Sequence, residues 1–142
     1  MDYSSMAEGD RAGLALFRDV SAWVGVQKIN GAFRVSFWSG LTMSSTWATS
    51  NVGKEVAGAA VSGGKIWLRI YADIQPSGTK KGTFLYSTDG TSFKELGKLS
   101  MITDWHFFMG YRYAIFNQAT KALGGKVTVA SFTVDAPGRT TP

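Results

Sequence analysis

Short segments of alternating apolar and polar residues, separated by turn residues, run along almost the whole chain. This pattern is typical of an all-β sandwich or barrel built from antiparallel strands. Asn30-Gly31 and Asp89-Gly90 predict tight hairpins, because such dipeptides tolerate the positive φ that two-residue turns require. The segments predicted as strands are residues 11–18, 21–29, 32–38, 55–61, 65–74, 83–87, 92–99, 107–116 and 126–134.

Three stretches depart from the strand pattern. Residues 39–54 are rich in serine and threonine and are predicted as a polar loop. Residues 117–123 are helix-compatible but suffice for only one or two turns. Residues 136–142 hold two of the three prolines and are expected to be a disordered tail or linker. Residues 1–135 then form one domain, which is long enough to bury a core.

Residues 65–74 give the most specific pattern. Alternate side chains of a strand point to opposite faces, and here one alternate set, or parity, is entirely aliphatic while the other is not. The second parity holds Trp67, Arg69, Tyr71 and Asp73. Aromatic planes pack on the C–H patches of a sugar ring, while charged planar groups bind its hydroxyls. The face is therefore a candidate sugar platform. A half-solvated sheet face, or a face that packs on a neighbouring domain, would carry the same residue types.

The formal net charge of +5 raises the question of nucleic-acid binding. The basic residues are scattered among acidic ones and only Lys80 and Lys81 adjoin, so nucleic-acid binding is not expected. No apolar run reaches the length of a membrane span. The first residues show no basic region followed by an apolar stretch, so no signal peptide is visible.

Catalytic motifs are sparse. Cysteine is absent and His106 is the single histidine, which excludes thiolate chemistry and a metal site of several imidazoles. Neither a G-x-S-x-G elbow nor a glycine-rich loop before a helix is present. Almost all acidic residues fall at predicted turns, so an acid pair for glycoside chemistry is not evident. No cofactor is expected, and a structural calcium ion at a turn aspartate would lack a loop motif to support it.

Three blocks of the sequence resemble a known family. They are EGDRAGLALFRD (residues 8–19), YSTDGTSF (residues 86–93) and FFMGYRYAIFNQATKALGG (residues 107–125). They are similar to the C-terminal domain of glycoside hydrolase family 43 β-xylosidases and arabinofuranosidases, and the similarity runs from near residue 1 to about residue 135. The resemblance implies a jelly-roll, concanavalin A-like β-sandwich that follows a five-bladed catalytic propeller.

The resemblance also implies a function. The family's catalytic acids belong to the propeller, so no residue of this chain inherits them. We predict a non-catalytic carbohydrate-binding or accessory domain, whose partners are xylan or arabinoxylan oligosaccharides and a catalytic β-propeller in cis. The predicted carbohydrate-binding residues are Trp67, Arg69, Tyr71, Asp73 and Arg112. The alternatives are a structural domain that packs on the propeller without binding sugar, and a residual hydrolase.

The resemblance has one departure. In the family the sandwich normally begins several strands before the segment that matches MDYSSMAEGDRAG. The chain is then either a fragment of a longer enzyme, which would be secreted, or a separate product without those strands. In the second case an unpaired sheet edge would need dimerisation or a different strand order to cover it.

Overall fold

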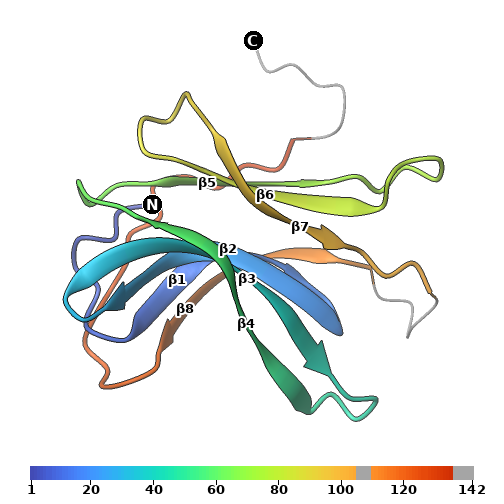
Figure 1. Cartoon of the computed structure of the whole chain (residues 1–142), viewed down its shortest axis with the longest axis horizontal. Helices are drawn as coiled ribbons and strands as arrows, with labels where there is room; N and C mark the ends of the chain where they lie inside the picture. Colours follow the sequence, from blue (N-terminus) through green and yellow to red (C-terminus); the bar gives the residue numbers. More distant parts are fainter. Residues whose placement is uncertain (105–109, 136–142) are drawn as a thin grey trace.

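The computed structural model describes residues 1–104 and 110–135, which form two antiparallel sheets packed face to face (Figure 1). The larger sheet has the strand order β4-β3-β2-β1-β8, and the smaller one has the order β5-β6-β7. The described residues contain no helix, and so none that could cross a membrane. The all-β, concanavalin A-like sandwich predicted from the sequence is confirmed. The strands are β1 Asp10–Phe17, β2 Val20–Ile29, β3 Ala32–Met43, β4 Thr49–Ala60, β5 Trp67–Ala72, β6 Lys81–Ser87, β7 Lys94–Ser100 and β8 Arg112–Ala119.

Local turn chemistry explains two of the hairpins. Asn30 and Gly31 both have positive φ, 52° and 76°, and they join β2 to β3 as predicted. Gly90 has a φ of 80° in the connection between β6 and β7. The third glycine turn, Gly63-Gly64, also has positive φ, but it carries the chain from the larger sheet to the smaller one.

Two sequence predictions are wrong in the larger sheet. Residues 39–54 are mostly strand, because β3 continues to Met43 and β4 already begins at Thr49. This end of the β3–β4 hairpin extends beyond the smaller sheet, so its side chains need not alternate between core and solvent (Figure 1). Residues 117–123 form no helix, because β8 pairs with β1 as far as Ala119. Pairing with β1 therefore overrides the weak helix preference.

The prediction of a last strand over residues 126–134 is also wrong. The segment is extended, but its only bridge joins Thr128 to Asp2 among the described residues. The predicted strand over residues 107–116 is realised as β8 from Arg112 on. His106 and residues 107–109 lie outside the described part of the chain.

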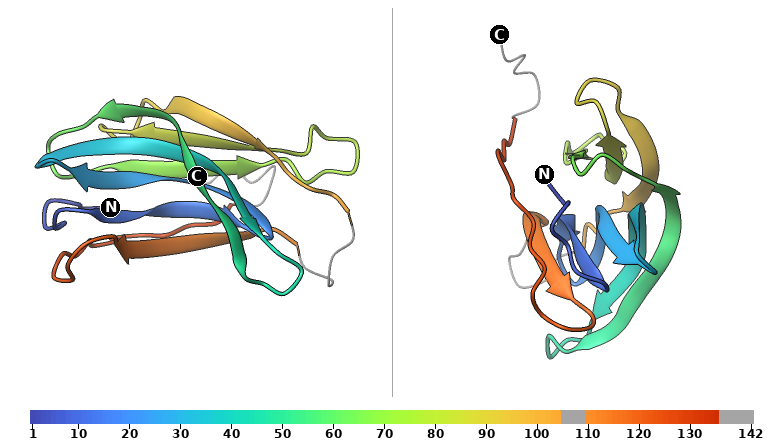
Figure 2. Two further views of the ribbon diagram at one scale, coloured as in Figure 1. Left: turned by 60° about the horizontal axis from the view of Figure 1, so that its bottom comes forward. Right: turned by 90° about the vertical axis from the view of Figure 1, so that its left-hand side faces the viewer.

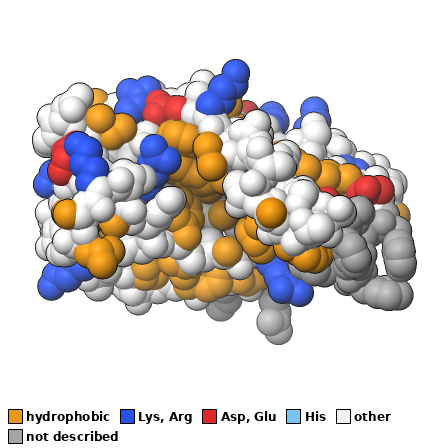
Figure 3. Space-filling view, turned by 90° about the horizontal axis from the view of Figure 1, so that it is seen from below, with side chains coloured by type: hydrophobic (Ala, Val, Ile, Leu, Met, Phe, Trp, Pro, Cys, Tyr) orange, Lys and Arg blue, Asp and Glu red, His pale blue; other side chains and the backbone are white. Residues whose placement is uncertain are grey.

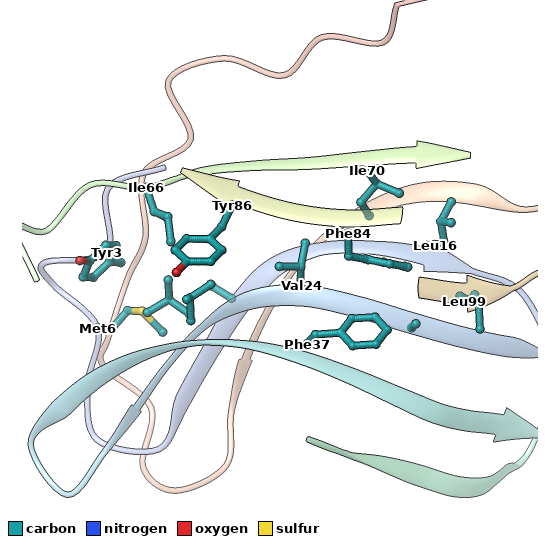
Figure 4. Close-up of a cluster of buried hydrophobic side chains, with 14 of the residues drawn as sticks. Tyr3, Met6, Leu16, Val24, Phe37, Ile66, Ile70, Phe84, Tyr86 and Leu99 are labelled. Atoms are coloured by element: carbon teal, nitrogen blue, oxygen red, sulfur yellow. The ribbon is translucent and has the colours of Figure 1, made fainter. Parts of the chain in front are cut away.

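The core lies between the two sheets and is made of their inward side chains (Figure 4). Phe37 of β3 packs on Phe84 of β6 with ring centroids 4.9 Å apart. Tyr3 closes one end of this layer, where its ring meets Phe33 and its hydroxyl donates to the Ser62 carbonyl at 2.8 Å. The alternation seen in the sequence thus separates a buried inner face from an outer face on each sheet.

We predict that Ile70→Ala lowers the free energy of unfolding by about 2–5 kcal/mol, because Ile70 is buried in this core. Ile74→Ala is the matched control, since Ile74 is exposed beyond the end of β5 and its truncation should change stability little. Urea unfolding of both variants measures the difference. Equal losses would contradict the assignment of the two residues to core and surface.

We predict that Asp89 makes the stability of the β6–β7 turn depend on pH. Its carboxylate accepts backbone N–H groups of Ser92 and Thr91 and the Ser87 hydroxyl, which lowers the pKa of Asp89 well below its ordinary value of 3.8. A lowered folded pKa stabilises the protein above the unfolded pKa, and this stability is lost as the pH falls through the folded value.

Urea unfolding of Asp89→Asn at several pH values measures this effect. Asp135→Asn is the control, because it alters a carboxylate that is exposed. The Asp89→Asn variant should be less stable than the parent at neutral pH, and the difference should shrink below about pH 4. A difference that does not change with pH would contradict this account.

Candidate functional site

The outer face of β5 carries three of the residues that the sequence singled out. Trp67 and Tyr71 are 43% and 57% exposed, and Arg69 lies between them on the same parity. The Arg69 guanidinium stacks 3.7 Å from the centroid of the Phe93 ring, and its Nη1 donates to the Tyr71 hydroxyl at 3.3 Å. A Cβ on Gly90 would lie 3.0 Å from the Trp67 ring, so the indole rests against the β6–β7 turn. This surface, the β5 platform, is open to solvent.

The other two predicted residues do not join the β5 platform. Asp73 accepts the backbone N–H and the hydroxyl of Thr79 at 2.6 and 2.8 Å, and these hydrogen bonds lower its pKa. Its carboxylate therefore holds the loop after β5. Arg112 is exposed at the start of β8 in the larger sheet, opposite Phe17 of β1. The structure thus groups Trp67, Arg69 and Tyr71 on β5, uses the Asp73 carboxylate in the loop that follows, and places Arg112 in the other sheet.

A second outer surface is concave. The outer face of the larger sheet encloses a hollow of about 370 Å³, and Figure 3 shows hydrophobic side chains gathered along the middle of this face. Small-molecule sites commonly occupy about 300–1,000 Å³, so the hollow is large enough for a ligand. The residues that line the hollow are Arg11, Ala15, Phe17, Asp19, Ser21, Ala22, Trp23, Leu41, Thr42, Met43, Thr49, Asn51, Val52, Ala114, Phe116 and Gln118.

Packed aromatic rings form one side of the hollow. The Trp23 ring stacks on Trp38, with centroids 5.3 Å apart and planes 11° apart, and it meets the edge of Phe116 at 5.2 Å. Gly13 and Gly25 lie directly opposite each other on the same face. A Cβ on either would fall 2.2–2.3 Å from a backbone oxygen of the partner strand. No side chain fits at either position, and both glycines are buried and lie outside the lining of the hollow.

A hydrogen-bond network lies next to the rings. Glu55 of β4 accepts from Arg34 Nε at 2.6 Å, from Gln27 Nε2 at 2.7 Å and from Ser36 Oγ at 3.1 Å. Gln27 is 1% exposed, and its Oε1 has no hydrogen-bond partner among the described residues. The guanidinium of Arg11 lies 4.2 Å from the Trp38 ring centroid. Burial lowers the pKa of Arg11 and the charge of Glu55 opposes that shift. Of these residues only Arg11 lines the hollow, and the network lies beside it.

The hollow was not predicted from the sequence, although part of its signal is present there. Arg11, Trp23 and Trp38 stand on the parity opposite the aliphatic residues of β1, β2 and β3, as Trp67 does on β5. The contrast between an aliphatic and an aromatic or charged parity, used for residues 65–74, would therefore also have marked these three residues as a candidate binding surface. What the sequence could not supply was the pairing of β8 with β1, which brings Phe116 and Gln118 to the same surface.

The described residues include no group of three or more His, Cys, Asp or Glu side chains that could hold a metal ion. Four carboxyl groups of the described residues have pKa values shifted from the ordinary value, and all four shifts are downward. They belong to Asp2, Glu8, Asp73 and Asp89. Each of these groups accepts hydrogen bonds in its ionised form, and none is held protonated as a general acid would be.

Two antiparallel sheets with a concave outer face and a mixed aromatic and polar lining define a concanavalin A-like sandwich domain. Residues 1–135 match the family model of the β-xylosidase C-terminal concanavalin A-like domain. The chain therefore belongs to the family of C-terminal domains of glycoside hydrolase family 43 (GH43), as the sequence resemblance indicated. No curated protein matches the sequence.

The solved structures that are similar to the chain include two GH43 proteins. One is a GH43 glycoside hydrolase whose engineered active site displays both endo-xylanase and exo-arabinofuranosidase activity, with 37% identity and a TM-score of 0.81. The other is a bifunctional GH43-CE protein of Bacteroides eggerthii, with 35% identity and a TM-score of 0.74. Each match covers 87% of this chain but only 25% and 15%, respectively, of the similar chain. The chain thus spans a small part of these larger proteins.

Proposed function

We propose that the chain is a non-catalytic accessory domain that binds xylan or arabinoxylan chains through the hollow. The observation that carries the proposal is the combination of a concave shape, an apolar lining and polar groups at its border. Sugar rings offer apolar C–H patches and many hydroxyls, so they need both kinds of surface at once. Phe17, Leu41 and Val52 supply apolar contact, while Arg11, Asn51 and Gln118 supply hydrogen-bonding groups.

The ordered position of Arg11 supports the same proposal. Arg11 lines the hollow, and its guanidinium lies 4.2 Å from the centroid of the Trp38 ring, so it is held in place before a ligand arrives. Preorganised groups bind more tightly because less side-chain entropy is lost on binding.

The family supports the proposed glycan class and partner domain. The family is named for β-xylosidases, and a similar structure is a GH43 enzyme that displays endo-xylanase and exo-arabinofuranosidase activity. We therefore assign xylan-type chains to the hollow, and a catalytic β-propeller in cis as the domain that uses them. The β5 platform is a second candidate surface for the sugar, because Trp67 and Tyr71 present exposed rings on either side of Arg69.

We predict that Phe17→Ala and Gln118→Ala each weaken retention on insoluble xylan by about fivefold or more, the effect of losing an anchor worth about 1–3 kcal/mol. Both side chains are partly or largely exposed, so the melting temperature should stay nearly unchanged. Val56→Ala is the control, an exposed apolar truncation on β4 outside the hollow.

The companion variants Trp67→Ala and Tyr71→Ala locate the sugar. Loss of retention in these two, with unchanged binding in the hollow variants, would place the sugar on the β5 platform instead. A large drop in melting temperature for Trp67→Ala would show that the platform has a packing role. No retention by the parent chain would favour a structural domain that packs on the propeller without binding sugar.

We predict that the purified chain hydrolyses neither aryl xylosides nor aryl arabinosides. The two carboxylates beside the hollow are already engaged, since Glu55 accepts three hydrogen bonds and Asp19 pairs with Arg18 at 2.8 Å. Glycoside hydrolysis needs a carboxylic acid that can donate a proton, opposite a second carboxylate. Turnover that persists through repurification and disappears in Glu55→Gln or Asp19→Asn would contradict the prediction.

A further inference from the structure

One of the cations that line the hollow has hydrogen-bonding capacity that the protein does not use. Within residues 1–104 and 110–135, the Arg11 guanidinium makes no ion pair and donates no hydrogen bond. None of its side-chain nitrogen atoms is both buried and without a partner, so its free N–H groups are open to solvent. A guanidinium carries five N–H donors in a planar fork. Arg11 therefore offers these donors to whatever occupies the hollow.

The strand pairing fixes where this guanidinium lies. Arg11 of β1 lies opposite Gln27 of β2, whereas Trp38 of β3 lies opposite Trp23 of β2. The arginine side chain thus crosses β2 to reach the indole, 4.2 Å from the ring centroid, which is a cation–π distance. On its other side β1 pairs with β8, drawn in orange in the left-hand view of Figure 2, where Gln118 lies directly opposite Arg11. The two side chains both line the hollow and lie next to each other.

The charges around Arg11 leave it without a counter-ion of its own. Glu55 attracts it electrostatically, but one Glu55 oxygen already accepts from Arg34 at 2.6 Å. The other oxygen accepts from Gln27 and Ser36. One carboxylate thus serves two guanidinium groups, so one positive charge remains uncompensated. Burial also lowers the pKa of Arg11, because an unpaired cation is costly to desolvate. An anion placed against the free N–H groups would offset this cost.

The far end of the hollow has the opposite character. Phe17 stands six residues along β1 from Arg11, which is roughly 20 Å in a strand. Asp19 follows it, and its carboxylate pairs with the buried Arg18 at 2.8 Å. Arg11 and Asp19 are the charged residues of the lining, and the rest is apolar or neutral. A chain with many carboxylates would place charge on apolar surface and near Asp19. A neutral chain with a single acidic group fits both ends.

We infer that Arg11 makes the hollow selective for xylan chains that carry a carboxylate, and that the group it binds is a uronic-acid side group. The inference rests on the proposed binding of xylan-type chains in the hollow and names the members of that class that it prefers. The guanidinium fork matches the two carboxylate oxygens with parallel hydrogen bonds, which a lysine could not do. The Gln118 amide donates to the same group or to a neighbouring hydroxyl. The neutral sugar rings then extend toward Phe17.

The test uses two ligands that differ only in charge. One is a xylo-oligosaccharide with a single glucuronic-acid side group, and the other is the same molecule after reduction of its carboxyl group to an alcohol. Calorimetry measures both affinities for the parent chain and for Arg11→Gln, Arg11→Lys and Arg112→Gln. The last variant is the matched control, since it removes an exposed guanidinium from the same face of the larger sheet, outside the lining of the hollow. Melting temperatures show that each variant is folded.

We expect the parent chain and Arg112→Gln to bind the acidic oligosaccharide about tenfold or more tightly than the reduced one, the effect of a charge-assisted hydrogen-bond pair. Arg11→Gln should bind the two ligands equally, with little change for the reduced one. Arg11→Lys should keep only part of the preference, because it retains the charge and loses the fork. Raising the salt concentration from about 0.05 M to about 0.5 M should weaken binding of the acidic ligand alone.

Equal binding of the two oligosaccharides by the parent chain would overturn the selectivity and leave the proposed function standing. Loss of the preference in Arg112→Gln but not in Arg11→Gln would place the carboxylate at Arg112 and overturn the assignment. An equal loss of both ligands in a folded Arg11→Gln would show that Arg11 binds sugar hydroxyls, which would also overturn it. Binding of neither ligand by the parent chain would overturn the proposed function, and this inference with it.

Discussion

The packing of Phe37 against Phe84 joins the two sheets, and the rest of the structure depends on it. Gly97 and Gly82 make room for this layer, because a Cβ on Gly97 would lie 2.3 Å from the Phe37 ring and one on Gly82 would lie 2.4 Å from Leu16. Large residues of one sheet thus fill the space left by small residues of the other, as dense packing requires. The three strands of the smaller sheet lie over β1 to β4, at one side of the five-stranded sheet. Tyr113 and Ile115 on β8 at the other edge therefore stay exposed in the described chain.

Face alternation decided which features the sequence could reveal. The inner faces and the two hairpins at Asn30-Gly31 and Asp89-Gly90 were predictable, because parity and positive φ are local properties. Residues 39–54 were misassigned because a hairpin that extends beyond the partner sheet has no core side to keep apolar. The helical prediction for residues 117–123 failed because the partner of β8 is β1, about a hundred residues earlier in the chain. Long-range pairing leaves no local pattern.

The candidate site divides in the same way. Trp67, Arg69 and Tyr71 could be placed together from one strand, and the structure brings them together on one exposed face. Asp73 follows the same parity, yet its carboxylate is taken by Thr79, since the loop after β5 needs an acceptor. The hollow draws residues from several strands, so its shape depends on strand order and curvature. Only the sheet topology could show that Arg11, Trp23 and Phe116 lie around one space.

The facing glycines Gly13 and Gly25 have a consequence for comparing sequences. A side chain at either position would collide with the backbone of the neighbouring strand, and rotation about χ1 could not relieve the collision. The close approach of β1 and β2 therefore requires glycine at both positions. Relatives that keep this spacing should have glycine at both, whereas a side chain at either would force the two strands apart. Two positions of a sequence then indicate whether a relative keeps the same spacing of these strands.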